Sequence, residues 1–252
     1  MQLTLLERPT PLTARDFKVR LEEKLTELKG ELNASATLEG FSQRGWAQIE
    51  VSGEDTEIVT ELISNTLSLA HAGLREEDLP QVWDAQIVGV DAKGLKFDAG
   101  LESQNETSLI PTSSLRAQLA DGKPLALQRL VESYCLYPGE RISVRITRRI
   151  ENEVEGWLSD FQMDLLSDRI TSGLDRIEVF DCYKEDVESA IHKAHLSRDI
   201  INLEHENLTL QSVVCKLGTD AVGLIPKLGR VLRKQKLEPF LPARIVNRCR
   251  PW

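Results

Sequence analysis

Five short strand-like runs between residues 82 and 160, with a helix-like stretch after the third, limit most strongly what this chain can fold into. The first two runs, in "VWDAQIVGVDAKGLKFDAG", form a hairpin pattern in which Leu95, Phe97 and Ala99 alternate with other residues after Gly94. Five short strands with a helix after the third are typical of a small closed barrel of the OB type. We therefore predict an OB-type barrel for residues 82–160.

The segments on either side of this barrel share one order of predicted elements. Residues 1–78 show β-α-β-β-α, and residues 174–252 show β-α-β-β-α-β, closing with "LEPFLPARI" as a strand. Because this order is widely reused, duplication and convergence both stay open. The predicted fold class is α+β: a small five-stranded OB-type β-barrel flanked by two β-α-β-β-α (ferredoxin-like) sandwich units, with residues 161–173 as a connecting helix. In the second helix of the N-terminal unit we expect a stripe of Ile58, Val59, Leu62 and Ile63.

Composition is that of a soluble globular protein, with 41% hydrophobic and 28% charged residues. No stretch is apolar over the ~18 residues that a membrane span needs, and the start lacks the pattern of a signal peptide. We expect a cytoplasmic protein without a membrane partner. The cysteines lie far apart, without C-x-x-C or a histidine at ligand spacing, and are expected to be reduced thiols. They are Cys135, Cys182, Cys215 and Cys249.

Charge is unevenly distributed along the chain. The net charge is −9, yet residues 216–252 hold nine basic and two acidic residues. A basic patch on an acidic body can hold a phosphate backbone while the rest of the surface repels non-specific contacts, although solvated tail charges would give the same pattern. The candidates for nucleic-acid binding in this part are Lys227, Arg230, Arg233, Lys234 and Lys236, followed on the tail by Arg244, Arg248 and Arg250. Trp252 is a candidate to stack on a base or dock on a partner.

Motifs of catalysis are scarce. Gly218 and Gly223 have the spacing of a phosphate-binding loop, but Leu224 and Ile225 stand where that loop requires lysine and a hydroxyl residue. We expect instead that Gly218 ends a strand and that Thr219 or Asp220 caps a helix. His192 and His195 are spaced as a possible metal pair or as solvated helix residues, and the acidic surroundings favour the latter. We therefore expect no catalytic residues, no metal and no cofactor.

Basic residues also gather on the predicted barrel, on or near the strands that an OB fold uses for its ligands. Alternation with the buried set predicts that Arg145 faces outward. The alternative is that these charges only keep exposed strands from aggregating. The candidates for nucleic-acid binding are Lys93, Lys96, Arg141, Arg145, Arg148 and Arg149.

The central segment resembles the OB-fold RNA-binding module of ribosomal and exosome proteins. The resemblance is carried by "KGLKFDAG", "SLIPTS", "PGERISVRIT" and "VEGWLSD", over about eighty residues. It implies an RNA-binding barrel. One departure is that Lys96 occupies the position of the family's exposed aromatic residue, while Phe97 takes an inward position. That departure favours contacts with the phosphate backbone, double-stranded RNA or a protein ligand.

The whole chain, including "GLDRIEVFD" and "LGTDAVGLIPKLG", is similar to an archaeal family of uncharacterised proteins. This resemblance implies an archaeal cytoplasmic protein of information processing and brings no catalytic residues. Our leading hypothesis is a non-catalytic RNA-binding or RNA-associated factor of transcription or translation. Its partners would be RNA, a large ribonucleoprotein or an RNA polymerase assembly. The alternatives are a protein–protein adaptor on RNA polymerase or the ribosome, and an enzyme of unrecognised type.

Overall fold

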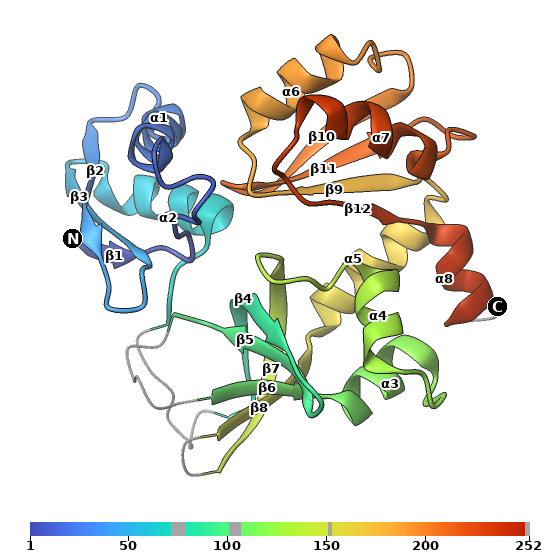
Figure 1. Ribbon diagram of the computed structural model, residues 1–252. Helices are drawn as coiled ribbons and strands as arrows, with labels where there is room; N and C mark the ends of the chain where they lie inside the picture. Colours follow the sequence, from blue (N-terminus) through green and yellow to red (C-terminus); the bar gives the residue numbers. More distant parts are fainter. Residues whose placement is uncertain (72–78, 101–106, 151–152, 250–252) are drawn as a thin grey trace. The chain divides into compact units, whose positions relative to one another are not determined.

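The computed structural model describes residues 1–71, 79–100, 107–150 and 153–249 (Figure 1). The chain forms two compact units. The first comprises Met1–Leu74 with Ala99–Gln104, and the second comprises Arg75–Asp98 with Asn105–Trp252. The division into four segments that the sequence suggests stays a prediction.

The first unit follows the predicted β-α-β-β-α order. Its three strands pair antiparallel in the order β1-β3-β2. The elements are β1 (Gln2–Thr4), α1 (Phe17–Lys29), β2 (Ala34–Phe41), β3 (Ala47–Gly53) and α2 (Thr56–Leu67). The two helices pack on each other and on the sheet, burying apolar side chains of α1, of α2 and of alternate positions on β3. The result is a two-layer α/β sandwich.

The predicted stripe of α2 is partly wrong. The helix buries Val59, Ile63 and Leu67, whereas Ile58 and Leu62 are 51% and 38% exposed. Residues four apart lie along one line of a helix, and the line one residue earlier is turned by about 100°. Because α2 meets a sheet of only three strands and one other helix, it buries a single narrow line of side chains.

The second unit contains a closed five-stranded barrel in the order β4-β5-β6-β8-β7. Its strands are β4 (Gln81–Val90), β5 (Gly94–Asp98), β6 (Thr107–Pro111), β7 (Arg141–Ile150) and β8 (Glu153–Leu158). Neighbouring strands are antiparallel except for β6 and β8, which are parallel. The connection after the third strand holds α3 (Thr112–Ala120) and α4 (Leu127–Tyr134), separated at Gly122 and Pro124. The predicted barrel and its helical insertion are thereby confirmed.

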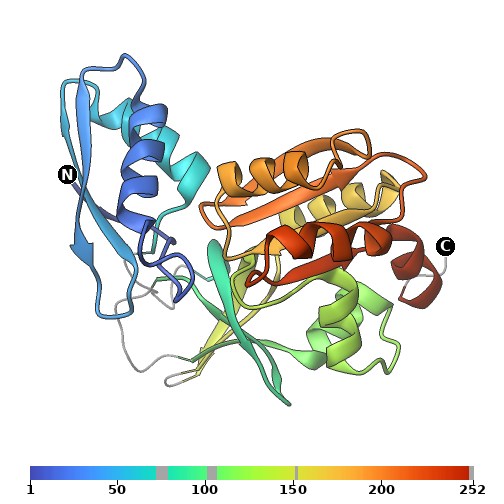
Figure 2. The same ribbon diagram turned by 45° about the horizontal axis from the view of Figure 1, so that its top comes forward.

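The remaining part of the second unit is a four-stranded antiparallel sheet in the order β10-β11-β9-β12. Its elements are β9 (Arg176–Phe180), α6 (Lys184–Lys193), β10 (Ile200–Asn207), β11 (Leu210–Cys215), α7 (Ala221–Val231) and β12 (Leu237–Phe240). Helices α6 and α7 lie side by side on one face of this sheet, as Figure 2 shows. Their core includes Val187, Leu224 and Leu228 with Ile177 and Val213 of the strands. Helix α5 (Asp160–Thr171) leads into this part and packs against β7.

The segment "LEPFLPARI" is a strand only in its first part. Strand β12 ends at Phe240, and the following residues form α8 (Pro242–Arg248). Proline is favoured at the first position of a helix, because the N–H that it lacks would have no partner within the helix there. Pro242 therefore starts a helix at the point where we predicted that the strand continues.

The glycine-rich stretch before α7 has a structural role. The Oδ1 atom of Asp220 accepts a hydrogen bond from the N–H of Val222 at 3.0 Å and so caps α7. Gly218 adopts φ +84°, a conformation that favours glycine. These contacts confirm the cap predicted from the sequence. In the described part of the chain, no helix combines the length and apolar character needed to cross a membrane.

Candidate nucleic-acid interface

An exposed tryptophan lies beside Arg145 on the outer face of the barrel. In the strand pairing, Arg145 of β7 stands opposite Val82 of β4 on one side and opposite Trp157 of β8 on the other. Residues directly opposite each other in neighbouring antiparallel strands project from the same face. The side chain of Trp157 is 45% exposed, although tryptophan is usually well buried. The barrel therefore presents an aromatic ring and a guanidinium group together.

A second exposed aromatic side chain follows at the start of α5. Phe161 is 68% exposed, and the preceding Asp160 forms an ion pair with Arg145. The helix start is fixed, because the Oγ atom of Ser159 accepts the N–H of Gln162 at 3.1 Å. The Oε1 atom of Gln162 in turn accepts the N–H of Ser143 in β7 at 2.9 Å. We call Val82, Arg145, Trp157 and Phe161 the aromatic face.

The exposed aromatic residue of the barrel is Trp157 on β8, whereas the resemblance placed one on β5. Lys96 is half-buried on β5 and Phe97 is buried, which confirms the inward position predicted for the phenylalanine. The signal for the tryptophan was present in "VEGWLSD". Val154 and Leu158 are buried. Strict alternation from Leu158 through Gly156 places Trp157 outside.

Lys96, Arg145 and Arg148 of the candidate cations on the barrel form ion pairs with carboxylates. The pairs are Lys96 with Asp91 (Nζ to Oδ2, 2.8 Å), Arg148 with Glu155 (Nε to Oε2, 2.7 Å) and Arg145 with Asp160. The hydrogen bond from Lys96, together with the backbone N–H of Lys93, lowers the pKa of Asp91 below its usual value. Exposed ion pairs contribute little to stability, so a phosphate can replace the carboxylate at small cost.

The other three candidates on the barrel differ in exposure. Lys93 is exposed at the turn between β4 and β5, and Arg141 and Arg149 are half-buried and engaged in contacts of their own. Arg145 lies directly opposite Trp157, and Arg148 lies opposite Glu155, which is two residues before Trp157 and projects from the same face of β8. The barrel therefore offers one cation beside exposed rings and several more along its strands, rather than one continuous basic field.

Two of the C-terminal candidates come together with residues that the sequence argument did not include. Lys227 and Arg230 of α7 line an open hollow of about 440 Å³ with Lys193 and His195 from the end of α6. Three cations thus surround one depression. Arg233 and Lys234 are exposed in the turn after α7, where the Nε atom of Arg233 donates to the carbonyl of Arg230 at 3.3 Å.

Lys236 differs from the other C-terminal candidates because its ammonium group lies against an aromatic ring and a carboxylate. Its Nζ atom lies 3.1 Å from the centre of the Tyr137 ring and 3.5 Å from Glu238 Oε1. The Tyr137 hydroxyl donates to Glu238 Oε2 at 3.2 Å. Burial lowers the pKa of Lys236. Lys236 thus links the connection between α4 and β7, which contains Tyr137, to Glu238 of β12. A phosphate would have to compete with these two contacts.

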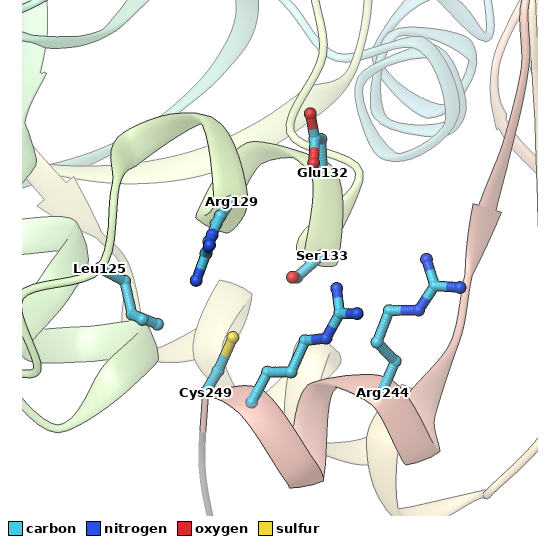
Figure 3. A pocket seen from close by; sticks show the side chains of 7 residues that line it. Leu125, Arg129, Glu132, Ser133, Arg244 and Cys249 are labelled. Atoms are coloured by element: carbon cyan, nitrogen blue, oxygen red, sulfur yellow. The ribbon is translucent and has the colours of Figure 1, made fainter.

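The tail candidates lie elsewhere. Arg244 and Arg248 of α8 line a separate cavity together with Arg129 of α4 (Figure 3). Arg250 and Trp252 fall outside the described residues, so their predicted roles stay predictions.

Within the described ranges, no group of three or more His, Cys, Asp or Glu side chains is placed to hold a metal ion. The Nδ1 atom of His192 lies 3.4 Å from the Ser197 hydroxyl, with which it can share a hydrogen bond. The two histidines singled out in the sequence therefore have other surroundings: His192 is beside Ser197, and His195 is in the hollow with Lys227.

Comparison with known proteins adds a family match in the last third of the chain. Residues 174–238 match the model of the family described as the DUF2110 C-terminal domain. This range contains most of the "GLDRIEVFD" stretch and all of "LGTDAVGLIPKLG", and it supports the predicted resemblance to an uncharacterised-domain family. No curated protein matches the chain.

Among solved structures, the chain is similar to a multidomain protein with nucleic acid binding domains from Streptococcus pneumoniae TIGR4. The identity is 11% and the TM-score 0.23. The match covers 79% of this chain and 52% of that chain, so this chain spans about half the length of the other. A TM-score this low says nothing about the function of the chain.

Proposed function

We propose that this chain is a non-catalytic RNA-binding factor that holds single-stranded RNA on the outside of its barrel. The observation that carries the proposal is the exposed ring of Trp157 beside the guanidinium of Arg145 on neighbouring strands. The proposed role in transcription or translation rests on the resemblance of the chain to an archaeal family, and this surface supports the contact with RNA.

The chemistry of the aromatic face suits an unpaired base. Base stacking on an aromatic side chain contributes ~1–3 kcal/mol per base and tolerates any sequence. Trp157 supplies one such surface, and Phe161 at the start of α5 supplies another. Duplex RNA hides its bases in the stack and would use neither ring. The proposal therefore favours single strands over duplexes, which differs from what the position of Lys96 suggested.

Phosphates would be held by the cations near these rings. Arg145 and Arg148 both lie on β7. Each forms an ion pair with a carboxylate, and a phosphate oxygen can take the place of that carboxylate. The hollow of Lys193, Lys227 and Arg230 offers a further basic surface. The net charge of −9 over the whole chain would limit non-specific binding to these places.

The first test replaces the ring. Trp157→Ala should weaken binding of a labelled single-stranded RNA about tenfold, because one stacking contact is lost. Fluorescence anisotropy at low and at physiological salt measures this, with duplex RNA of the same sequence beside it. Phe41→Ala is the matched control, because Phe41 is exposed to a similar degree, 46%, on the first unit. Equal losses in both variants, or no binding even at low salt, would reject the proposal.

The second test reverses the cations. Changing Arg145, Arg148 and Arg149 to glutamate should weaken binding and lower the salt slope by about 0.7 for each lost phosphate contact on single strands. The control is Arg15→Glu, which reverses a single charge at an exposed position of the first unit. If the slope is unchanged while affinity falls, the three arginines do not contact phosphates.

A protein–protein adaptor is the second candidate, and the ion pairs favour it. With Lys96, Arg145 and Arg148 already neutralised, the aromatic face is an apolar patch of the kind that anchors protein partners. An adaptor predicts that a partner co-purifies with the chain after nuclease treatment and is lost in Trp157→Ala. Loss of all partners on nuclease treatment would favour the RNA-binding function.

A further inference from the structure

A cavity with three arginines lies between α4 and α8 and shares no lining residue with the aromatic face. Its volume is about 350 Å³. Figure 3 shows Arg129 and Ser133 reaching from α4, Arg244 rising from α8, and Leu125 and Cys249 at the other side. The lining residues are Leu125, Arg129, Glu132, Ser133, Arg244, Arg248 and Cys249.

The four-residue spacing on both helices builds this cavity. Arg129 and Ser133 are four apart on α4 and project from one face, and Arg244 and Arg248 do the same on α8. Two such pairs facing each other place the polar groups in one space. The sequence separation of the two helices exceeds a hundred residues, so only the fold brings these groups together.

Hydrogen bonds hold the walls in place. The Nε atom of Arg116 donates to the carbonyl of Leu125 at 2.7 Å and fixes the loop before α4. The Nζ atom of Lys123 donates to the carbonyl of Cys249 at 3.3 Å and fixes the end of α8. On its inner side α8 buries Pro242 and Ile245. The cavity is therefore a defined part of the second unit.

The net charge of the cavity is positive and favours a bound anion. Three guanidinium groups and the carboxylate of Glu132 leave a net charge of +2 at neutral pH. Glu132 accepts a hydrogen bond from Gln128 at 2.9 Å. In the described ranges, the structure records no hydrogen bond or ion pair from the guanidinium groups of Arg129, Arg244 and Arg248. Neighbouring like charges repel each other, and a bound anion would remove that repulsion.

Two further groups near the cavity, Asp175 and Ser133, are compatible with a bound anion. The charge of Arg244 acts on Asp175, whose pKa is raised by burial and lowered to a smaller extent by the N–H of Ala221 and by this arginine. The hydroxyl of Ser133, a residue only 7% exposed, likewise has no protein partner within the described ranges. A nearly buried hydroxyl among guanidinium groups is a further donor for the same anion.

We propose that this cavity binds the phosphate group of a phosphate ester or diphosphate. Arginine recognises phosphate through paired N–H donors, and a net charge of +2 matches a phosphomonoester dianion. The volume falls in the range of small-molecule pockets, roughly 300–1,000 Å³, and exceeds what a bare phosphate ion needs. None of the seven lining residues is aromatic, so the site binds the phosphate group and offers no ring on which a base could stack. The site does not depend on the proposed RNA binding.

Isothermal titration calorimetry of the full chain with inorganic pyrophosphate tests the proposal. Arg129→Gln and Arg244→Gln should each weaken binding about tenfold or more, and Ser133→Ala by less, since a neutral donor contributes less than a charged one. The matched control is Arg198→Gln, which removes an exposed charge outside the cavity and should change affinity less than twofold. Circular dichroism confirms that each variant is folded.

Two further arms identify the source of the phosphate. A mononucleotide that displaces pyrophosphate from the wild-type chain but not from Arg244→Gln would indicate a small-molecule ligand. A 5′-phosphorylated oligonucleotide that binds at least tenfold tighter than its 5′-hydroxyl form, with the difference lost in Arg244→Gln, would indicate an RNA end. Trp157→Ala should leave pyrophosphate binding unchanged, which separates this site from the aromatic face. No pyrophosphate binding at millimolar concentration, or equal loss in Arg198→Gln, overturns the proposal.

Discussion

Gly94→Ala is expected to destabilise the second unit by about 3 kcal/mol, at the upper end of what overpacking a core costs. A Cβ atom at this position would lie 2.1 Å from the carbonyl oxygen of Ile110, 3.0 Å from its carbon and 3.1 Å from Cα of Pro111. All three atoms belong to the backbone, so no rotation of a side chain can relieve the clash. Strands β5 and β6 would have to separate at the point where Gly94 pairs with Pro111.

Closure of the barrel makes that separation costly. The N–H of Thr112 donates to the carbonyl of Lys93 at 2.9 Å next to the clash, and the neighbouring pair, Leu95 and Ile110, is fully buried. Urea denaturation measures the loss of free energy of unfolding. Hydrogen exchange of the backbone amides should be fastest, relative to wild type, in β5 and β6, which would show that the loss of stability is local to these strands.

Gly89→Ala is the matched control for this change. Gly89 also lies in the barrel, on β4, but a Cβ atom there would meet no atom within 4 Å. Its replacement should change the free energy of unfolding by less than about 1 kcal/mol. If both variants lose the same stability, the effect is due to alanine replacing glycine in a strand and not to the contact with Ile110.

Alternation along the strands was enough to predict the barrel. Leu95 and Phe97 on β5, and Ile142, Val144 and Ile146 on β7, point inward as the period of two requires. Those positions depend on local pattern alone, which a single sequence displays. Arg145 and Trp157 follow from the same rule, yet their contact depends on the register between β7 and β8, which the sequence does not state.

The candidate sites were harder to predict because they depend on long-range contacts. Arg129 gave no signal in the sequence, since its role arises only where α8 packs beside α4. The prediction that "LPARI" is a strand removed that helix from consideration. Lys236 was grouped with its basic neighbours, although Tyr137, whose ring lies against its ammonium group, is almost a hundred residues away in the sequence. Charge runs along the chain thus say little about which cations share a surface.

The second unit should lose stability steeply between about pH 9 and 11 because of its buried thiols. Burial, with a smaller effect of Asp186, raises the pKa of Cys182 to about 12. Burial, with a smaller effect of Asp175, raises the pKa of Cys215 to about 11. Burial also raises the pKa of Cys135 well above its usual range. Unfolded thiols ionise near pH 9, so the folded state binds more protons above that pH.

The sign and size of the effect follow from linkage. A group with a raised pKa in the folded state contributes stability that is complete below its unfolded pKa and is lost as the pH rises toward the folded pKa. One thiol costs at most about 1.4 kcal/mol per pH unit in that window, so Cys182 and Cys215 together cost several kcal/mol by pH 11, and Cys135 acts in the same direction. The raised pKa of Tyr137 acts in the same direction above pH 10. The lowered pKa of Lys236 has the opposite sign and acts up to pH 10.5.

Urea denaturation at pH 8, 9, 10 and 11 compares the wild-type chain with Cys215→Ala. The variant should be less stable at pH 8, since a buried side chain is shortened. Its stability should nevertheless fall less steeply, by about 1 kcal/mol per pH unit between pH 9 and 11, because one titrating group is gone. Val213→Ala is the control, as Val213 lies in the same core on the same strand and cannot ionise. Equal slopes in wild type, Cys215→Ala and Val213→Ala would mean that burial does not hold this thiol protonated. The alkaline loss would then have to come from Tyr137 or from the surface charges.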